Sequence, residues 1–199
     1  RQGRERMSEP ELNHKVYQYA HSQMRQHVGR GECWDLVDAA LRYAGAVRNA
    51  GGGDEVDYVW GTEIGPHQTI AGDVVQLRNY EFVVKTVTRV EFDDGEFTQN
   101  TKTESTKRPH HTAIVDHYTT KGLVIIEQNY PKGSKVTQNT LPLSNFGPIT
   151  ETSFVSRKDA KGKMRPAKVS VTTTVEVSGR IWAYRPKASE SAPKHKGKQ

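Results

Sequence analysis

The 199-residue chain has one cysteine, Cys33, and no long hydrophobic run. A single cysteine excludes an internal disulfide and any zinc site that uses several cysteines. A membrane-spanning helix needs about 18 consecutive apolar residues, so no membrane span is predicted. The first ten residues, RQGRERMSEP, lack the apolar core of a secretory signal. The length suits one domain with a hydrophobic core, or at most two very small ones.

The formal net charge of +6 is concentrated in three short segments. The charge is +2 in residues 1–6, +5 in residues 157–168 and +3 in residues 186–199. The rest of the chain therefore carries −4. We expect these segments to be solvated arms and a loop around a mildly acidic body. The chain has no zinc-finger spacing and no RNP-like aromatic pattern, so no specific nucleic-acid partner is predicted. The basic arms predict nonspecific attraction to anionic polymers instead.

Two helices are predicted near the N-terminal end. The segment SEPE at 8–11 has the pattern of a capping box, and the helix that follows is expected to end at the glycines of 29–31. A second helix is expected to begin near Cys33 and to stop around Gly45. The acidic residues of this second helix, Asp35 and Asp38, are expected either on a solvated face or as partners of the positive end of the helix dipole.

After the glycines at 51–53, short runs rich in β-branched and aromatic residues predict strands. The predicted strands include 58–60, 73–77, 82–92, 111–118, 123–129, 150–155, 169–177 and 180–184. Asp94-Gly95 predicts a hairpin turn between strands at 86–92 and 97–101, and the polar stretch 98–109 is expected to be a mobile loop or hairpin end. Helices followed by six to eight strands indicate an α+β fold with a largely antiparallel sheet.

Cys33 is the candidate nucleophile because it opens a helix. The free backbone N–H groups and the positive end of the helix dipole favour a thiolate at that position. A lone cysteine near a helix is also compatible with a small buried hydrophobe.

His111, Glu127 and Asn129 are the candidate partners of Cys33. Glu127 and Asn129 share one face of a strand because side chains alternate along it. An odd-length turn at 120–122 would place odd-numbered residues of both hairpin strands on that face. All three side chains then converge, which is what a general base and its orienting group require.

A metal site built from the histidines around His111 is not expected. His110 and His111 face opposite sides of the predicted strand. Six residues of strand place His111 and His117 about 20 Å apart, too far to share one ion. The sequence therefore predicts neither a metal nor a cofactor.

Five segments, in this order, resemble the CHAP branch of the NlpC/P60 papain-like cysteine hydrolases. They are Gly31-Glu32-Cys33-Trp34, Ala71-Gly72-Asp73-Val74-Val75, His111-Thr112-Ala113-Ile114-Val115, Glu127-Gln128-Asn129 and RIWAYRP at 180–186. The resemblance covers roughly residues 12–186. It implies a papain-like NlpC/P60-CHAP fold in which N-terminal helices pack on a largely antiparallel sheet.

The resemblance also implies roles for the candidate residues. Cys33 would be the nucleophile and His111 the general base, while Glu127 and Asn129 would orient the imidazole, with either of the two dominant. The backbone N–H of Cys33 would contribute to an oxyanion hole. The substrate would be a peptide or peptidoglycan amide, and a peptidoglycan-directed protein would be secreted or held in the cell envelope.

Two features depart from the CHAP pattern. Trp34 stands where the family commonly has a small or hydroxyl residue, and the segment between Asp73 and His111 is longer than usual. We interpret 79–109 as an inserted hairpin or loop within one catalytic domain of residues 11–186. A basic arm at 1–10 and a disordered basic tail at 187–199 would flank that domain.

A second resemblance is to a cysteine-protease-like domain at the C-terminus of fungal myosin tail region-interacting proteins. The stretches GECWDLVDAAL and YVWG carry it. It implies a cytoplasmic adaptor, in which the domain could be a non-catalytic protein-interaction module with the same fold.

Overall fold

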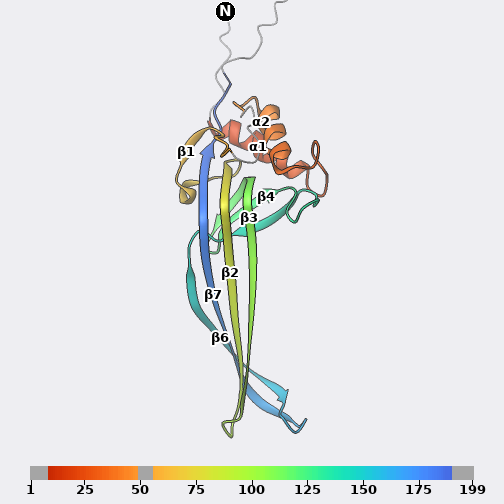
Figure 1. The fold of residues 1–199 in the computed structure, drawn as a ribbon, viewed down its shortest axis with the longest axis vertical. Coiled ribbons are helices and arrows are strands. Elements are labelled where there is room, and N and C mark those ends of the chain that lie inside the picture. The colour runs from red at the N-terminus through yellow and green to blue at the C-terminus, as the bar shows by residue number, and fades with distance from the viewer. Residues whose placement is uncertain (1–8, 49–55, 190–199) are drawn as a thin grey trace, which may run out of the picture. The chain divides into compact units, whose positions relative to one another are not determined.

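The computed structural model describes residues 9–48 and 56–189 (Figure 1). Its elements are α1 (Glu9–Ser22), α2 (Cys33–Ala44), β1 (Thr62–Ile64), the 3-10 helix η1 (Pro66–Gln68), β2 (Val74–Phe92), β3 (Phe97–Thr119), β4 (Gly122–Glu127), β5 (Thr137–Leu141), β6 (Phe146–Lys158) and β7 (Met164–Arg185). The predicted cap Ser8, the glycines at 51–53, most of the N-terminal arm and the tail from residue 190 lie outside the described residues.

The helix predictions hold better at α2 than at α1. Helix α2 starts at Cys33 and ends against Gly45, whose left-handed φ of 74° closes it as predicted. Helix α1 stops at Ser22, before the expected glycines, because the chain turns at Arg25 with φ 66°. The backbone N–H of Arg25 is donated to the Val136 carbonyl at 2.9 Å rather than to a helical partner. Neither helix has the length and apolar character of a membrane span, nor does any other helix in the described residues.

The α+β class and the antiparallel sheet are confirmed. In the described residues the strand order is β1-β7-β2-β3-β4-β5, and β6 also pairs with β7. The pairs β1–β7, β3–β4, β4–β5 and β6–β7 are antiparallel. These seven strands lie within the predicted range of six to eight.

The predicted domain of residues 11–186 comprises two compact units. Unit 1 holds residues up to 80, 108–143 and 179 onward, and unit 2 holds 81–107 and 144–178. Strands β2, β3 and β7 each contribute residues to both units. The polar stretch 98–109 is therefore part of strand β3, and its prediction as a mobile loop is wrong. The two strands expected at 169–177 and 180–184 form one continuous strand, β7.

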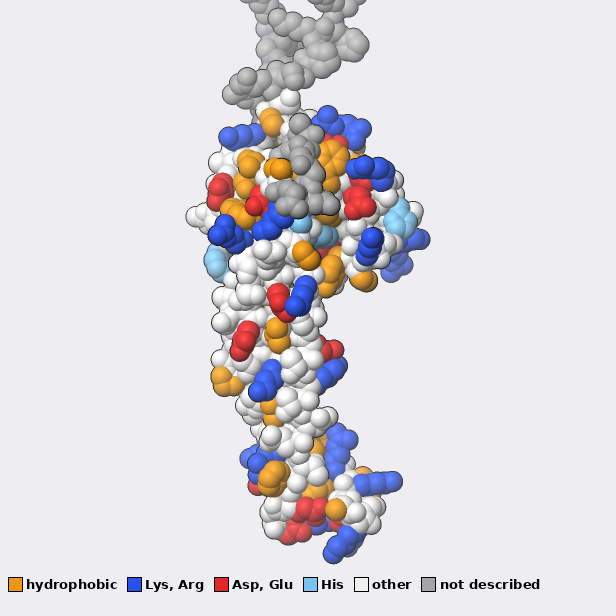
Figure 2. Space-filling model, viewed as in Figure 1, with side chains coloured by type: hydrophobic (Ala, Val, Ile, Leu, Met, Phe, Trp, Pro, Cys, Tyr) orange, Lys and Arg blue, Asp and Glu red, His pale blue; other side chains and the backbone are white. Residues whose placement is uncertain are grey.

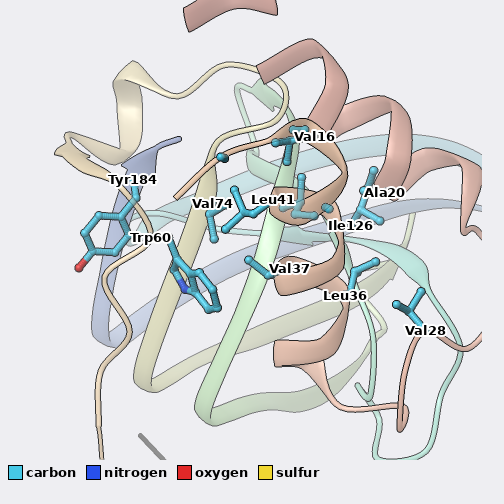
Figure 3. Packing of buried hydrophobic residues seen from close by; sticks show 14 of the residues in the cluster. Val16, Ala20, Val28, Leu36, Val37, Leu41, Trp60, Val74, Ile126 and Tyr184 are labelled. Carbon is cyan, nitrogen blue, oxygen red and sulfur yellow. The ribbon is translucent and has the colours of Figure 1, made fainter. Parts of the chain in front are cut away.

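The core of unit 1 lies between the two helices and the sheet. Figure 3 shows Leu36, Val37 and Leu41 of α2 directed toward Val74 of β2 and Ile126 of β4, all fully buried. The apolar residues of α2 recur every three to four positions, so one side of the helix covers the sheet. This packing places the first turn of α2 beside the end of β4.

In unit 2 the basic segment 157–168 is not the free loop predicted from its charge. It forms the ends of β6 and β7 and the turn between them. Arg165, near the start of β7, forms ion pairs with four acidic residues, which are Asp93, Asp94, Glu96 and Asp159. Figure 2 likewise shows Lys and Arg side chains interspersed with Asp and Glu. The charge of Arg165 is thus compensated locally, and binding of anionic polymers by the arms stays a prediction.

The predicted tail also begins later than residue 187. The Lys187 carbonyl accepts the backbone N–H of Val47 at 2.8 Å, and the Ser189 N–H is donated to Gly45 at 3.0 Å. Residues 187–189 are therefore tied to the segment that follows α2.

Asp73 joins three distant segments of unit 1. Its fully buried carboxylate accepts the Asn13 side-chain amide at 2.6 Å, the Ile70 backbone N–H at 2.8 Å and Arg185 at 3.0 Å. Two of the segments that the sequence singled out, 71–75 and 180–186, are thereby connected by one salt bridge. Such charge-assisted bonds compensate the cost of burying the carboxylate.

The glycine before this aspartate leads to a stability prediction. Gly72 has φ 85°, and a Cβ at this position would lie 2.0 Å from the Asn13 carbonyl oxygen. Gly72→Ala should lower the free energy of unfolding by about 2–3 kcal/mol, because backbone strain and a steric clash add. Gly45→Ala is the control: its φ is 74° with nothing within 4 Å, so only strain of about 1 kcal/mol is expected. Urea unfolding followed by tryptophan fluorescence measures both, and equal losses would contradict the clash.

Candidate active site

Cys33 is half-buried at the first turn of α2, and the chain before it is held by a buried carboxylate. Asp35 accepts the backbone N–H groups of Arg30 at 2.7 Å and Glu32 at 3.3 Å. Asp35 is only 8% exposed and Asp38 only 4%, so neither lies on a solvated face, whereas the alternative expectation of a carboxylate at the helix start agrees with Asp35. Unpaired N–H groups at a helix start attract carboxylates, and the bonds from these groups compensate the burial of Asp35.

Gln128 fixes the same loop from the side of the sheet. Its side-chain oxygen accepts the Val28 N–H at 2.7 Å, and its amide donates to the carbonyls of Val28 at 3.0 Å and Glu32 at 2.9 Å. Gln128 is fully buried. Because Gln128 directly follows Glu127, this clamp sets the position of Cys33 relative to the end of β4. The sequence predicts that Gln128 points away from Glu127 but does not reveal this role.

His111 lies between the Cys33 sulfur and the Glu127 carboxylate. Its Nε2 is 2.7 Å from Glu127 Oε2, and the side chains are 6% and 0% exposed. The ring N–H does not point straight at that oxygen, so the contact is a close charge pair more than a well-aligned hydrogen bond. The Cys33 side chain lies close enough to the imidazole to raise the pKa of His111. Because Nε2 faces Glu127, Nδ1 is the ring nitrogen left for the sulfur.

Arg108 is a member of the site that the sequence analysis missed. Its guanidinium binds Glu127 through two bonds, Nε to Oε2 at 2.9 Å and Nη2 to Oε1 at 2.6 Å. Asn139 donates to the same Oε1 at 2.7 Å. The Arg108 side chain is 1% exposed and lies over the Tyr130 ring, 3.7 Å from its centroid. Glu127 is thus held by a cation, an amide and an imidazole at once.

The charges of this network set its protonation state. Burial lowers the pKa of His111, but Cys33 and Glu127 outweigh that effect and raise it to about 9. Burial raises the pKa of Glu127, but His111 and Arg108 outweigh it and lower the value to about 2. At neutral pH the imidazole is therefore cationic and the carboxylate ionised. The site therefore places an imidazolium, paired with a carboxylate, beside the cysteine.

The structure brings together three of the four predicted site residues. His111 lies beside both Cys33 and Glu127, whereas the Asn129 amide is bound elsewhere. Asn129 Nδ2 donates to Glu32 Oε2 at 2.7 Å, and its Oδ1 accepts the Gly133 N–H at 2.6 Å. With φ 66°, Asn129 has already left the strand at a turn. The catalytic roles of all four residues stay predictions.

The histidines near His111 have separate partners. His110 Nε2 lies 2.9 Å from the Val56 carbonyl, and its ring packs near Tyr58. No group of three or more potential metal-ligating His, Cys, Asp or Glu side chains occurs among the residues that the structure describes.

The fold and the assembled side chains define a domain of the cysteine-proteinase-fold class. The family model described as AIM3/BBC1 cysteine proteinase-fold domain matches residues 7–148, and the chain belongs to that family. The matched region contains α1, α2, strands β1–β5 and all the site residues. Comparisons with curated proteins and with solved structures gave no match.

The family match supports one of the two resemblances seen in the sequence. It agrees with the cysteine-protease-like domain of the fungal adaptor proteins and with a protease-like fold. It does not extend to CHAP or NlpC/P60, so peptidoglycan as a substrate has no support from the comparison.

Proposed function

We propose that this domain is a cysteine-dependent hydrolase that cleaves a peptide amide bond. The observation that supports it best is the buried His111, which contacts the Cys33 sulfur and lies 2.7 Å from Glu127. A nucleophile, a proton carrier and an orienting carboxylate are the parts that thiol hydrolysis needs. The buried Arg108 adds a fixed positive charge that keeps the carboxylate ionised.

The proposed reaction proceeds through an acyl-enzyme. The Cys33 thiolate attacks the amide carbonyl carbon, and the oxygen that gains the electron pair is stabilised in part by the backbone N–H of Cys33. His111 then gives its Nδ1 proton to the amine as the C–N bond breaks, which leaves a thioester on Cys33. Neutral His111 next takes a proton from water, which attacks the thioester and releases the carboxylic acid and the thiolate.

Reactivity of the single cysteine tests the site before any substrate is known. At pH 6 iodoacetamide should alkylate Cys33 at least ten times faster than glutathione, because a thiolate reacts and a thiol does not. His111→Ala should remove most of that advantage. Intact mass spectrometry measures the rate, and the exposed His117, replaced by Ala, is the matched control and should change little. Equally slow labelling of the wild type and the His111 variant would contradict the hydrolase proposal.

Turnover identifies the bond that is cut. Wild type and Cys33→Ala are incubated with a peptide library and, in parallel, with purified peptidoglycan, and mass spectrometry reads the products. Peptidoglycan is included because the CHAP resemblance implies it. If peptides are cleaved and peptidoglycan is not, the substrates are proteins or peptides.

A second candidate function is a non-catalytic protein-interaction module. The family match agrees with it through the resemblance to the adaptor domain, and unit 2 offers exposed apolar side chains. Ile149, Phe154 and Met164 are 54%, 81% and 55% exposed. Strand β6, which carries the first two, pairs only with β7 among the described strands and so has an open edge. Slow labelling of Cys33 and no turnover would favour this function.

A further inference from the structure

A basic groove lies beside the Cys33–His111–Glu127 site, entirely within unit 1. It has a volume of about 600 Å³ and runs between the loop at 25–27 and the segment 130–139. Both walls are tied together by backbone bonds of 2.9 Å: the Arg25 N–H is donated to Val136, and the Val136 N–H to Gln26. The groove is therefore formed before any ligand arrives.

The charged side chains that line the groove are all basic. Arg25, His27 and Lys135 line it, and its lining residues, all of them described, include no Asp or Glu. Two cationic side chains with no anionic one fit a carboxylate better than an apolar or basic group.

Two residues connect the groove to the candidate active site. Tyr130 lines the groove, and its ring lies against Arg108 and 6.2 Å from the His111 ring. Asn139 also lines it and donates to Glu127. A peptide in the groove would therefore lie next to the residue that carries the proton.

We propose that this groove binds an acidic side chain of the peptide substrate, close to the bond that is cut. The inference rests on the proposed hydrolase function and adds a substrate class to it. Arg25 and Lys135 attract the carboxylate, and the Tyr130 ring packs against the peptide.

Binding to an inactive protein tests the groove without turnover. Fluorescein-labelled, Ala-based hexapeptides that carry one Glu, scanned through each position, are compared with matched Gln peptides by anisotropy on Cys33→Ala. The best Glu peptide should bind about tenfold more tightly than its Gln partner at low salt, and the difference should shrink in 0.5 M NaCl. Lys135→Glu and Arg25→Glu should each abolish the preference. Lys132→Glu, an exposed change on the same segment but outside the groove lining, should preserve it.

The possible results separate this inference from the proposed function. Equal affinity for Glu and Gln peptides, or the same loss of preference in the Lys132 variant, would overturn the groove assignment even if Cys33 labels rapidly. A Glu preference that depends on Lys135 and Arg25, together with slow Cys33 labelling, would support the groove and refute the hydrolase.

Discussion

Replacing Arg108 with Met should lower the free energy of unfolding by about 3–5 kcal/mol, because it leaves the Glu127 carboxylate without its buried cation. Arg108 and Glu127 are 1% and 0% exposed, and two charge-assisted bonds of 2.6 and 2.9 Å join them. Water cannot replace the lost partner at such a position. The ionised carboxylate would keep only His111 and Asn139 as partners.

A double variant distinguishes loss of the ion pair from loss of packing. Arg108→Met combined with Glu127→Leu removes both charges, so it should be more stable than Arg108→Met alone. Arg42→Met is the matched control, since the Arg42 side chain is 66% exposed and its partner Asp38 also pairs with Arg48. It should cost less than about 1 kcal/mol. Urea unfolding can be followed by fluorescence, since all three tryptophans lie in unit 1. A double variant no more stable than Arg108→Met would contradict the charge argument.

The position of Arg108 could not be predicted from the sequence. Strand β3 passes through unit 2 before it reaches the site, and most of its first ten residues are exposed on both faces. A strand exposed on both faces lacks the alternation of apolar and polar residues by which strands are recognised. The polar stretch 98–109 therefore has the composition typical of a loop. The buried arginine at its end belongs to a strand that already continues into the core of unit 1.

The expected convergence of His111 and Glu127 is correct, although the reason given for it is not. The predicted odd-length turn would have kept odd-numbered residues on one face. In the structure Thr119 pairs with Gly122, so the turn has two residues and reverses that parity. An irregularity between Val115 and His117 shifts the register back, and Ile114 then pairs with Ile126. Periodicity alone could not reveal two compensating shifts.

Buried polar residues are the other features that the sequence concealed. Asp35 and Gln128 resemble surface residues in any pattern based on hydrophobicity, yet each accepts or donates bonds to backbone groups around Cys33. Their burial follows from unsatisfied N–H and carbonyl groups of a loop, and such groups become visible only in three dimensions. The start of α2 and its glycine cap were predictable because they depend on local sequence.

The stability that the His111 proton contributes should fall as the pH rises from about 6.5 to 9, because His111 keeps this proton in the folded protein only. Its pKa is raised from the ordinary 6.5 to about 9, chiefly by Cys33 and Glu127 against the effect of burial. Below pH 6.5 folded and unfolded chains are both protonated, so the contribution is fully present. Above it the unfolded chain loses the proton first, and stability declines by about 1.4 kcal/mol per pH unit, or about 3 kcal/mol in total.

At acid pH the dependence of stability on pH has the opposite sign. The pKa of Glu127 is lowered from 4.5 to about 2, so its contribution is present above pH 4.5 and is lost as the pH falls toward 2. The two contributions arise largely from one contact and do not add. Together they predict greatest stability from this pair between pH 4.5 and 6.5.

Urea unfolding of Cys33→Ala and of Cys33→Ala combined with His111→Gln, at pH 5.5, 7, 8 and 9, measures the contribution of the His111 proton, because Cys33→Ala removes the other titratable group beside the imidazole. The difference in unfolding free energy between the two proteins should shrink steadily across that range, since only Cys33→Ala keeps the titrating imidazole. The total decline should be smaller than about 3 kcal/mol, because Glu127 alone then raises the pKa of His111. Parallel pH profiles for the two proteins would show that Glu127 does not hold His111 as a cation, and would remove the charge pair on which the proposed thiol chemistry depends.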